Sequence, residues 1–112
     1  MKLTLTKRFS FSASFSGSNK IHAHNYALGV TVSCNAREID DAALAKRIDT
    51  ALIQKVQSRD LRMDVDFLKS LRINESNLLK IFWKIIRKEI HPLKLLALSL
   101  ARDKGTAYSL TR

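Results

Sequence analysis

The chain has 112 residues, of which 46% are hydrophobic and 27% charged, a composition typical of a folded protein and not of a disordered tail. Lys and Arg total 20 against 10 Asp and Glu, so the formal net charge is +10. The single cysteine, Cys34, excludes an internal disulfide and a paired-cysteine metal site. The first residues alternate in polarity, unlike a signal peptide, and no apolar run is long enough to span a membrane. We therefore expect one cytoplasmic domain covering residues 1–112, with no membrane partner.

The first third of the chain has the pattern of two β-strands. Residues 2–15 alternate between apolar and polar side chains, which is the period of a half-buried strand. Residues 16–20 have the composition of a turn, and a second alternating stretch runs from His22 to Cys34. Because so short a connection joins antiparallel strands, the pattern predicts a hairpin.

The apolar period then changes to that of helices. Asp40 is placed to cap a first helix, in which Leu44, Ile48, Leu52 and Val56 recur every four residues. A polar stretch follows and ends this helix.

A second helix is predicted to begin after Asn74, another good capping residue, and to run to about Ile90, where Pro92 ends it. Residues 93–102 and 106–111 read as strands joined by a tight turn. The predicted fold class is α+β, in the order ββααββ, with a four-stranded antiparallel sheet and both helices on one face.

Many of the basic residues fall on the predicted solvent faces of the two helices. We expect a solvated, diffusely positive coat, and the alternative is a surface that binds nucleic acid. These residues are Lys46, Arg47, Lys55, Arg59, Lys80, Lys84, Arg87 and Lys88.

The sharpest local feature is the run His22-Ala23-His24. Two histidines two residues apart on a strand point to the same face, close enough to share a metal ion. Zinc needs three or four ligands, and the remaining histidine, His91, is predicted to be exposed at the far end of the second helix.

The segment from Phe11 to Phe15, the polar loop after it, and the run from His22 to Tyr26 resemble the start of the 6-pyruvoyl- and 6-carboxy-tetrahydropterin synthase family. Ile39-Asp40, Asn77-Leu78 and Ala107-Tyr108 resemble later motifs of that family. The resemblance implies a T-fold subunit, a homo-oligomer joined through the first and last strands, a pterin-like small ligand, and zinc.

Two family features are missing from the metal site and its neighbour. Phe15 stands at the position of the first zinc-binding histidine and cannot bind a metal. The family's catalytic cysteine corresponds to Ser16 or Ser18, and a serine hydroxyl is a poor substitute for a thiol without a dedicated base.

The other departures concern the acid–base pair and the pterin. Where the family has an Asp-His pair, the chain has Asp66-Phe67, which keeps the aspartate and loses the histidine. The pterin-anchoring glutamate falls at Leu100 or Ala101, and a pterin-holding threonine becomes Asn74.

From these departures we expect a degenerate family member without zinc-dependent synthase activity and without a bound cofactor, acting as an oligomeric binding or scaffold module. One alternative is an active pterin-type carbon–oxygen or carbon–carbon lyase, with a metal site rebuilt on His22, His24 and a third ligand. A second alternative is a basic nucleic-acid-binding module.

Overall fold

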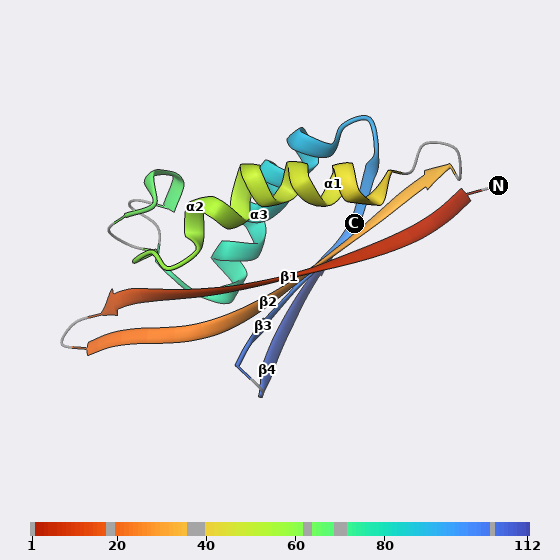
Figure 1. Ribbon diagram of the computed structural model, residues 1–112. Helices are drawn as coiled ribbons and strands as arrows, with labels where there is room; N and C mark the ends of the chain where they lie inside the picture. Colours follow the sequence, from red (N-terminus) through yellow and green to blue (C-terminus); the bar gives the residue numbers. More distant parts are fainter. Residues whose placement is uncertain (1, 18–19, 36–39, 62–63, 69–71, 104) are drawn as a thin grey trace.

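A computed structural model describes residues 2–17, 20–35, 40–61, 64–68, 72–103 and 105–112, and for Lys2 and residues 15–22 the backbone only. The strands β1 (Lys2–Gly17), β2 (Lys20–Asn35), β3 (Lys94–Arg102) and β4 (Thr106–Thr111) form one antiparallel sheet in the order β1-β2-β3-β4. Helices cover one face of this sheet, and the long β1–β2 hairpin extends beyond the two shorter strands (Figure 1). The predicted α+β class, element order and antiparallel pairing are confirmed.

The alternation in β1 and β2 sorts their side chains between the helix layer and the open face. Phe11, Tyr26, Leu28 and Val30 point toward the helices and are buried, while serine and threonine alternate with them on the other side. β3 departs from strict alternation because the pairing with β2 shifts between Thr31 and Val32. This irregularity lets Leu95 on one side of it, and Leu98 and Leu100 on the other, reach the same core.

The first helical region is continuous but irregular: α1 (Asp41–Ile48) leads into the π-helical segment η1 (Asp49–Ile53) and then α2 (Gln54–Val56). Apolar residues spaced by four drift around an ordinary helix, since it has about 3.6 residues per turn. The wider π turn reduces that drift, so that Leu44, Ile48, Leu52 and Val56 are all buried. Asp40 accepts a hydrogen bond from the backbone N–H of Ala43, as predicted for its cap.

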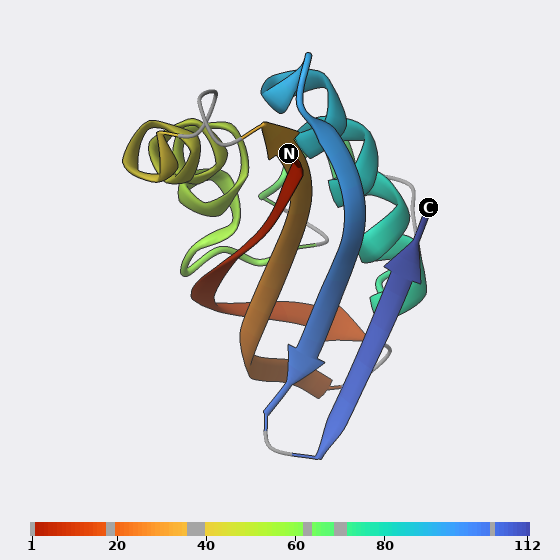
Figure 2. The same ribbon diagram turned by 90° about the vertical axis from the view of Figure 1, so that its right-hand side faces the viewer.

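The second helix, α3 (Glu75–Ile90), begins at its predicted cap, where the Asn74 side chain accepts from the N–H of Asn77 at 2.9 Å. Its apolar side, including Phe82 and Ile86, is fully buried against the sheet. Figure 2 shows α1 and α3 on opposite sides of the helix layer. A short 3-10 turn, η2 (Asp66–Leu68), precedes it.

The segment after α2 covers part of the outer edge of β1. Ser58 and Leu61 donate backbone hydrogen bonds to the carbonyls of Ser12 and Ser14, and Ser14 N–H donates to the carbonyl of Arg59. The Gln57 side chain accepts from Ser12 N–H at 3.0 Å. The sequence had predicted only a polar break here, whereas Leu61 is fully buried and the segment closes one end of an otherwise open edge.

Candidate functional site

Four polar residues come together at the end of the sheet where the β3–β4 turn lies beside β2. His24 and Asn25 lie on β2, Ser12 lies opposite Asn25 on β1, and Asp103 begins the turn after β3. Asp103 has a φ of 52°, a left-handed conformation that aspartate tolerates better than most residues. Its backbone N–H donates to the carbonyl of Asn25 at 2.8 Å, which continues the β2–β3 ladder by one step.

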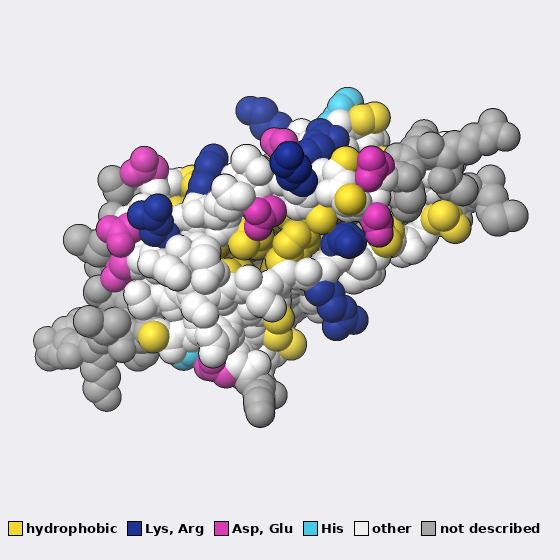
Figure 3. All heavy atoms as spheres, in the orientation of Figure 1, with side chains coloured by type: hydrophobic (Ala, Val, Ile, Leu, Met, Phe, Trp, Pro, Cys, Tyr) yellow, Lys and Arg dark blue, Asp and Glu magenta, His cyan; other side chains and the backbone are white. Residues whose placement is uncertain are grey.

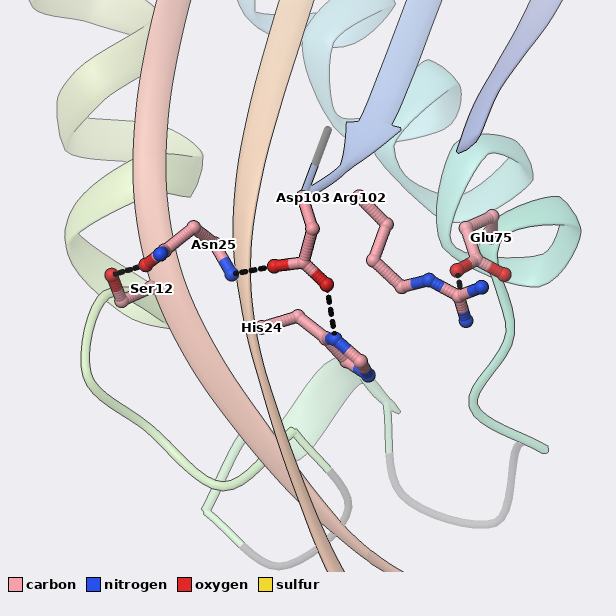
Figure 4. A network of polar contacts seen from close by, with 6 residues as sticks. All are labelled: Ser12, His24, Asn25, Glu75, Arg102 and Asp103. Carbon is pink, nitrogen blue, oxygen red and sulfur yellow. Dashed lines mark hydrogen bonds and ion pairs between the residues drawn. The ribbon is translucent and has the colours of Figure 1, made fainter. Parts of the chain in front are cut away.

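Asp103 organises a chain of hydrogen bonds at this point (Figure 4). Its Oδ2 lies 2.8 Å from Nδ1 of His24, and its Oδ1 accepts the backbone N–H of Asn25 at 3.1 Å. The hydroxyl of Ser12 donates to Oδ1 of Asn25 at 2.7 Å. The hydrogen bond with His24, and then that with Asn25, lowers the pKa of Asp103 below its usual value, so the carboxylate is ionised at neutral pH.

The pairing with Asp103 also fixes the imidazole of His24. An ionised carboxylate only accepts hydrogen bonds, so Nδ1 of His24 carries the proton. In the neutral ring Nε2 is then the basic nitrogen, which is the arrangement found in metal-binding and acid–base histidines. Sequence reasoning missed Asp103, because in the sequence it is only the first residue of a hairpin turn.

Two adjoining hollows open beside this chain of hydrogen bonds, with volumes of about 310 and 350 Å³. Ser12, Asn25 and Asp103 line both. Hydroxyl and amide side chains supply most of the remaining polar lining, and no described Lys or Arg contributes to either hollow. The site therefore places the carboxylate of Asp103 among hydroxyl, amide and imidazole groups.

A second polar pair lies on the other side of β3. Glu75, in the first turn of α3, is only 8% exposed, and its Oε1 lies 3.0 Å from Nη1 of Arg102 at the end of β3. Tyr26 is buried near this pair, and its pKa is raised to about 12, chiefly by burial and then by the charge of Glu75. The ion pair joins the start of α3 to the sheet, and nothing in the sequence beyond the two charges indicates it.

The predicted metal position is only partly described. The backbone register pairs Phe15 with His22 and Ala13 with His24, so the two histidines and Phe15 share one end of the hairpin. The side chains of His22 and Phe15, and all of Ser18, lie outside the described residues. Within the described part of the chain, no group of three His, Cys, Asp or Glu is placed to hold a metal ion. A phenyl ring at Phe15 does not complete a three-ligand zinc site, so the donor set from the sequence does not fit the metal.

The remaining predicted site residues have structural contacts. Leu100 is fully buried between its strand neighbours Leu28 and Tyr108, and Asn74 is the cap of α3. Asp66 is exposed in η2, and the ring of Phe67 packs against the hydrophobic core. The structure does not bring these four residues to the hollows.

No protein-family model and no curated protein matches the sequence. The fold, by contrast, is that of a tetrahydropterin synthase. The chain superposes on the structure of Caenorhabditis elegans 6-pyruvoyl tetrahydropterin synthase with a TM-score of 0.85 and 17% identity, over 100% of this chain and 96% of that one. An uncharacterized protein from Wolinella succinogenes matches with a TM-score of 0.73 and 13% identity, over 100% and 99% of the two chains. The T-fold that the resemblance implied is thus confirmed.

No described helix is both long enough and apolar enough to cross a membrane.

Proposed function

We propose that the chain is a 6-pyruvoyl tetrahydropterin synthase-like protein that lacks zinc-dependent synthase activity and binds a small ligand as part of a homo-oligomer. The observation that supports this most directly concerns the positions where the resemblance places catalytic and pterin-binding residues. In this chain several of those positions hold residues that pack the core or cap a helix. Leu100 fills the core where the resemblance places a pterin-anchoring carboxylate, and Asn74 uses its side chain to cap α3. Phe67, in place of a histidine, packs against the core.

The lining of the two hollows indicates which ligand the site accepts. Asp103 is ionised and no described Lys or Arg lines the hollows, so a phosphorylated ligand would meet the charge of Asp103 without a lining cation to bind it. A neutral or cationic ligand rich in N–H or O–H groups would instead be matched by Asp103 and by the surrounding hydroxyl and amide side chains.

Isothermal titration calorimetry tests this selectivity. We expect an unphosphorylated pterin, used as the probe for an N–H-rich heterocycle, to bind the purified protein more tightly than dihydroneopterin triphosphate. Asp103→Asn should weaken that binding by roughly tenfold or more, since it removes a charge-assisted hydrogen bond worth about 1.5–3 kcal/mol. Asp41→Asn, an exposed aspartate on α1 away from the hollows, is the matched control. Tighter binding of the triphosphate would refute the assignment.

The edges of the sheet support the oligomer. β1 and β4 are the outermost strands, and the described hydrogen bonds from the segment after α2 reach β1 at Ser12 and Ser14. By the alternation of an antiparallel strand, the N–H and C=O groups of Arg8 and Ser10 also point outward, beyond that cover. Light scattering should find a stable oligomer. Arg8→Pro, which removes an outward N–H without touching the β1–β2 ladder, should dissociate it, whereas Arg8→Ala should not.

One observation favours the alternative of a metal-binding lyase. Asp103 holds His24 with Nδ1 protonated, as carboxylates commonly hold metal-binding histidines. This alternative predicts stoichiometric zinc in the purified protein, lost in both His22→Ala and His24→Ala. The main proposal predicts that elemental analysis finds no stoichiometric zinc in any of the three.

A further inference from the structure

A row of basic side chains follows the exposed side of α3, away from the hollows. Lys80, Lys84, Arg87 and Lys88 are all exposed. At about 100° per residue they fall within an arc of roughly 100°, opposite the side that carries Phe82 and Ile86 into the core. We call these four residues the α3 row.

The α3 row is not neutralised. None of its four members forms an ion pair with a described residue. The two acidic residues of α3 lie elsewhere: Glu75 is buried against Arg102, and Glu89 faces Arg47 of the neighbouring α1. The exposed arc of α3 thus has cationic and neutral side chains and no carboxylate.

The face of the molecule near α1 and α2 is different. Figure 3 shows Asp and Glu side chains among the Lys and Arg side chains of this face. Lys7 pairs with Asp41 at 3.8 Å there. On α3, by contrast, the four cations of the row have no described carboxylate among them.

We propose that the α3 row binds the phosphate backbone of double-stranded nucleic acid, without reading its sequence. Eight residues of helix separate Lys80 from Lys88, a rise of about 12 Å, so a straight and rigid row of cations faces the partner. Duplex phosphates are a dense, regular line of negative charge that such a row can neutralise. Trp83, the aromatic residue beside the row, is half-buried and packs on the core, so its ring is only partly open to the bases of a single strand.

A membrane surface fits this row less well. Most of the apolar side of α3 is buried against the sheet, and its remaining apolar residues are themselves half-buried on the core, so no open apolar face is offered to a bilayer. Sequence-independent binding follows from the side chains themselves, because lysines and one arginine on an exposed helix contact phosphates without a fixed base partner.

Fluorescence anisotropy with a labelled DNA duplex of about 20 base pairs tests the proposal on the whole chain. Four phosphate contacts predict a slope of about −3.6 in log K against log salt concentration, so raising salt from 50 to 200 mM should weaken wild-type binding by about 150-fold. The variant K80Q/K84Q/R87Q/K88Q should lose most of that slope. The control R8Q/K46Q/K55Q/R59Q, which lowers the formal charge of +10 by the same four units, should keep it.

Several outcomes would overturn the proposal. One is equal loss of binding in the two variants, which would make the effect one of net charge alone. Others are no wild-type binding at 50 mM salt, tighter binding to a single strand than to the duplex, or salt-sensitive binding to phosphatidylserine vesicles without binding to DNA. Circular dichroism of both variants guards against misfolding, and single substitutions Lys84→Gln and Lys55→Gln repeat the comparison if either quadruple variant unfolds.

Discussion

Nδ1 of His24 and Oδ2 of Asp103 lie 2.8 Å apart, although 79 positions separate the two residues along the chain. The hydrogen bond joins the second strand to the turn between the last two strands. It makes the carboxylate the charged centre of the candidate site, and its consequences can be measured in the absence of any ligand.

The first prediction concerns acid stability. The pKa of Asp103 is lowered in the folded protein, first by the bond with His24 and then by that with Asn25 N–H. A lowered folded-state pKa contributes stability that is present above the unfolded value of about 3.9 and is lost as pH falls further. Urea unfolding between pH 2 and 6 should therefore show that the free energy of unfolding falls less toward low pH in Asp103→Asn than in the wild type. The control Asp41→Asn should behave like the wild type, and identical slopes in all three would contradict the bond.

The second prediction concerns alkaline stability. Tyr26 is 3% exposed, and its pKa is raised to about 12, whereas an unfolded tyrosine ionises near pH 10. Between these values the unfolded chain loses a proton that the folded chain keeps, so the free energy of unfolding falls by up to about 1.4 kcal/mol per pH unit. Tyr26→Phe should abolish this part of the fall between pH 10 and 12. Tyr108→Phe, at a residue that is 45% exposed, provides the comparison, and an unchanged slope in Tyr26→Phe would count against the burial of the phenol.

The third prediction concerns the close approach of β2 and β3 on the open face of the sheet. A Cβ atom added at Gly29 would lie 2.5 Å from Oγ of its strand neighbour Ser99 but an ordinary 3.8 Å from the Ser99 Cβ. The serine hydroxyl can rotate away, so Gly29→Ala should cost less than about 1 kcal/mol, and Gly29→Ala combined with Ser99→Ala should recover most of that cost. Thermal or urea unfolding of the wild type, the two single variants and the double variant gives the coupling free energy between the two positions. Strictly additive effects would show that the hydroxyl is not the obstacle.

The fourth prediction concerns the ion pair of Glu75 and Arg102. Arg102→Met leaves the nearly buried carboxylate without its partner at 3.0 Å and should destabilise the protein by about 2–4 kcal/mol. Arg87→Met, at an exposed position of α3 with no ion pair to a described residue, should change stability by less than about 0.5 kcal/mol. Equal effects of the two substitutions would mean that the pair does not hold α3 to the sheet.

The elements could be predicted because their signals are local. The alternation of Phe9, Phe11 and Ala13 follows the pleat of a strand, and the caps at Asp40 and Asn74 begin both helices where the sequence placed them. The π-helical segment in the first helix could not be predicted in the same way. It depends on the need to keep Ile48 and Leu52 in one core, which only the packed sheet imposes.

The site was harder to predict because its contacts are between distant strands. The pairing of β2 with β3 decides which turn residue meets His24, and an irregularity between Thr31 and Val32 sets the register of that pairing. In the sequence, His24 stands out because His22 lies two residues before it. Nothing in the sequence indicates that Asp103 is the residue that contacts His24. The residues where the family resemblance places chemistry, Leu100 and Asn74, are explained by the fold alone.

The proposed lack of synthase chemistry is tested most directly by one turnover assay. Purified protein incubated with excess zinc and dihydroneopterin triphosphate should form no more 6-pyruvoyl- or 6-carboxy-tetrahydropterin product, measured by chromatography, than a blank with zinc alone. Product that forms with zinc and disappears in His24→Ala would contradict the proposal and establish an active enzyme with a rebuilt site.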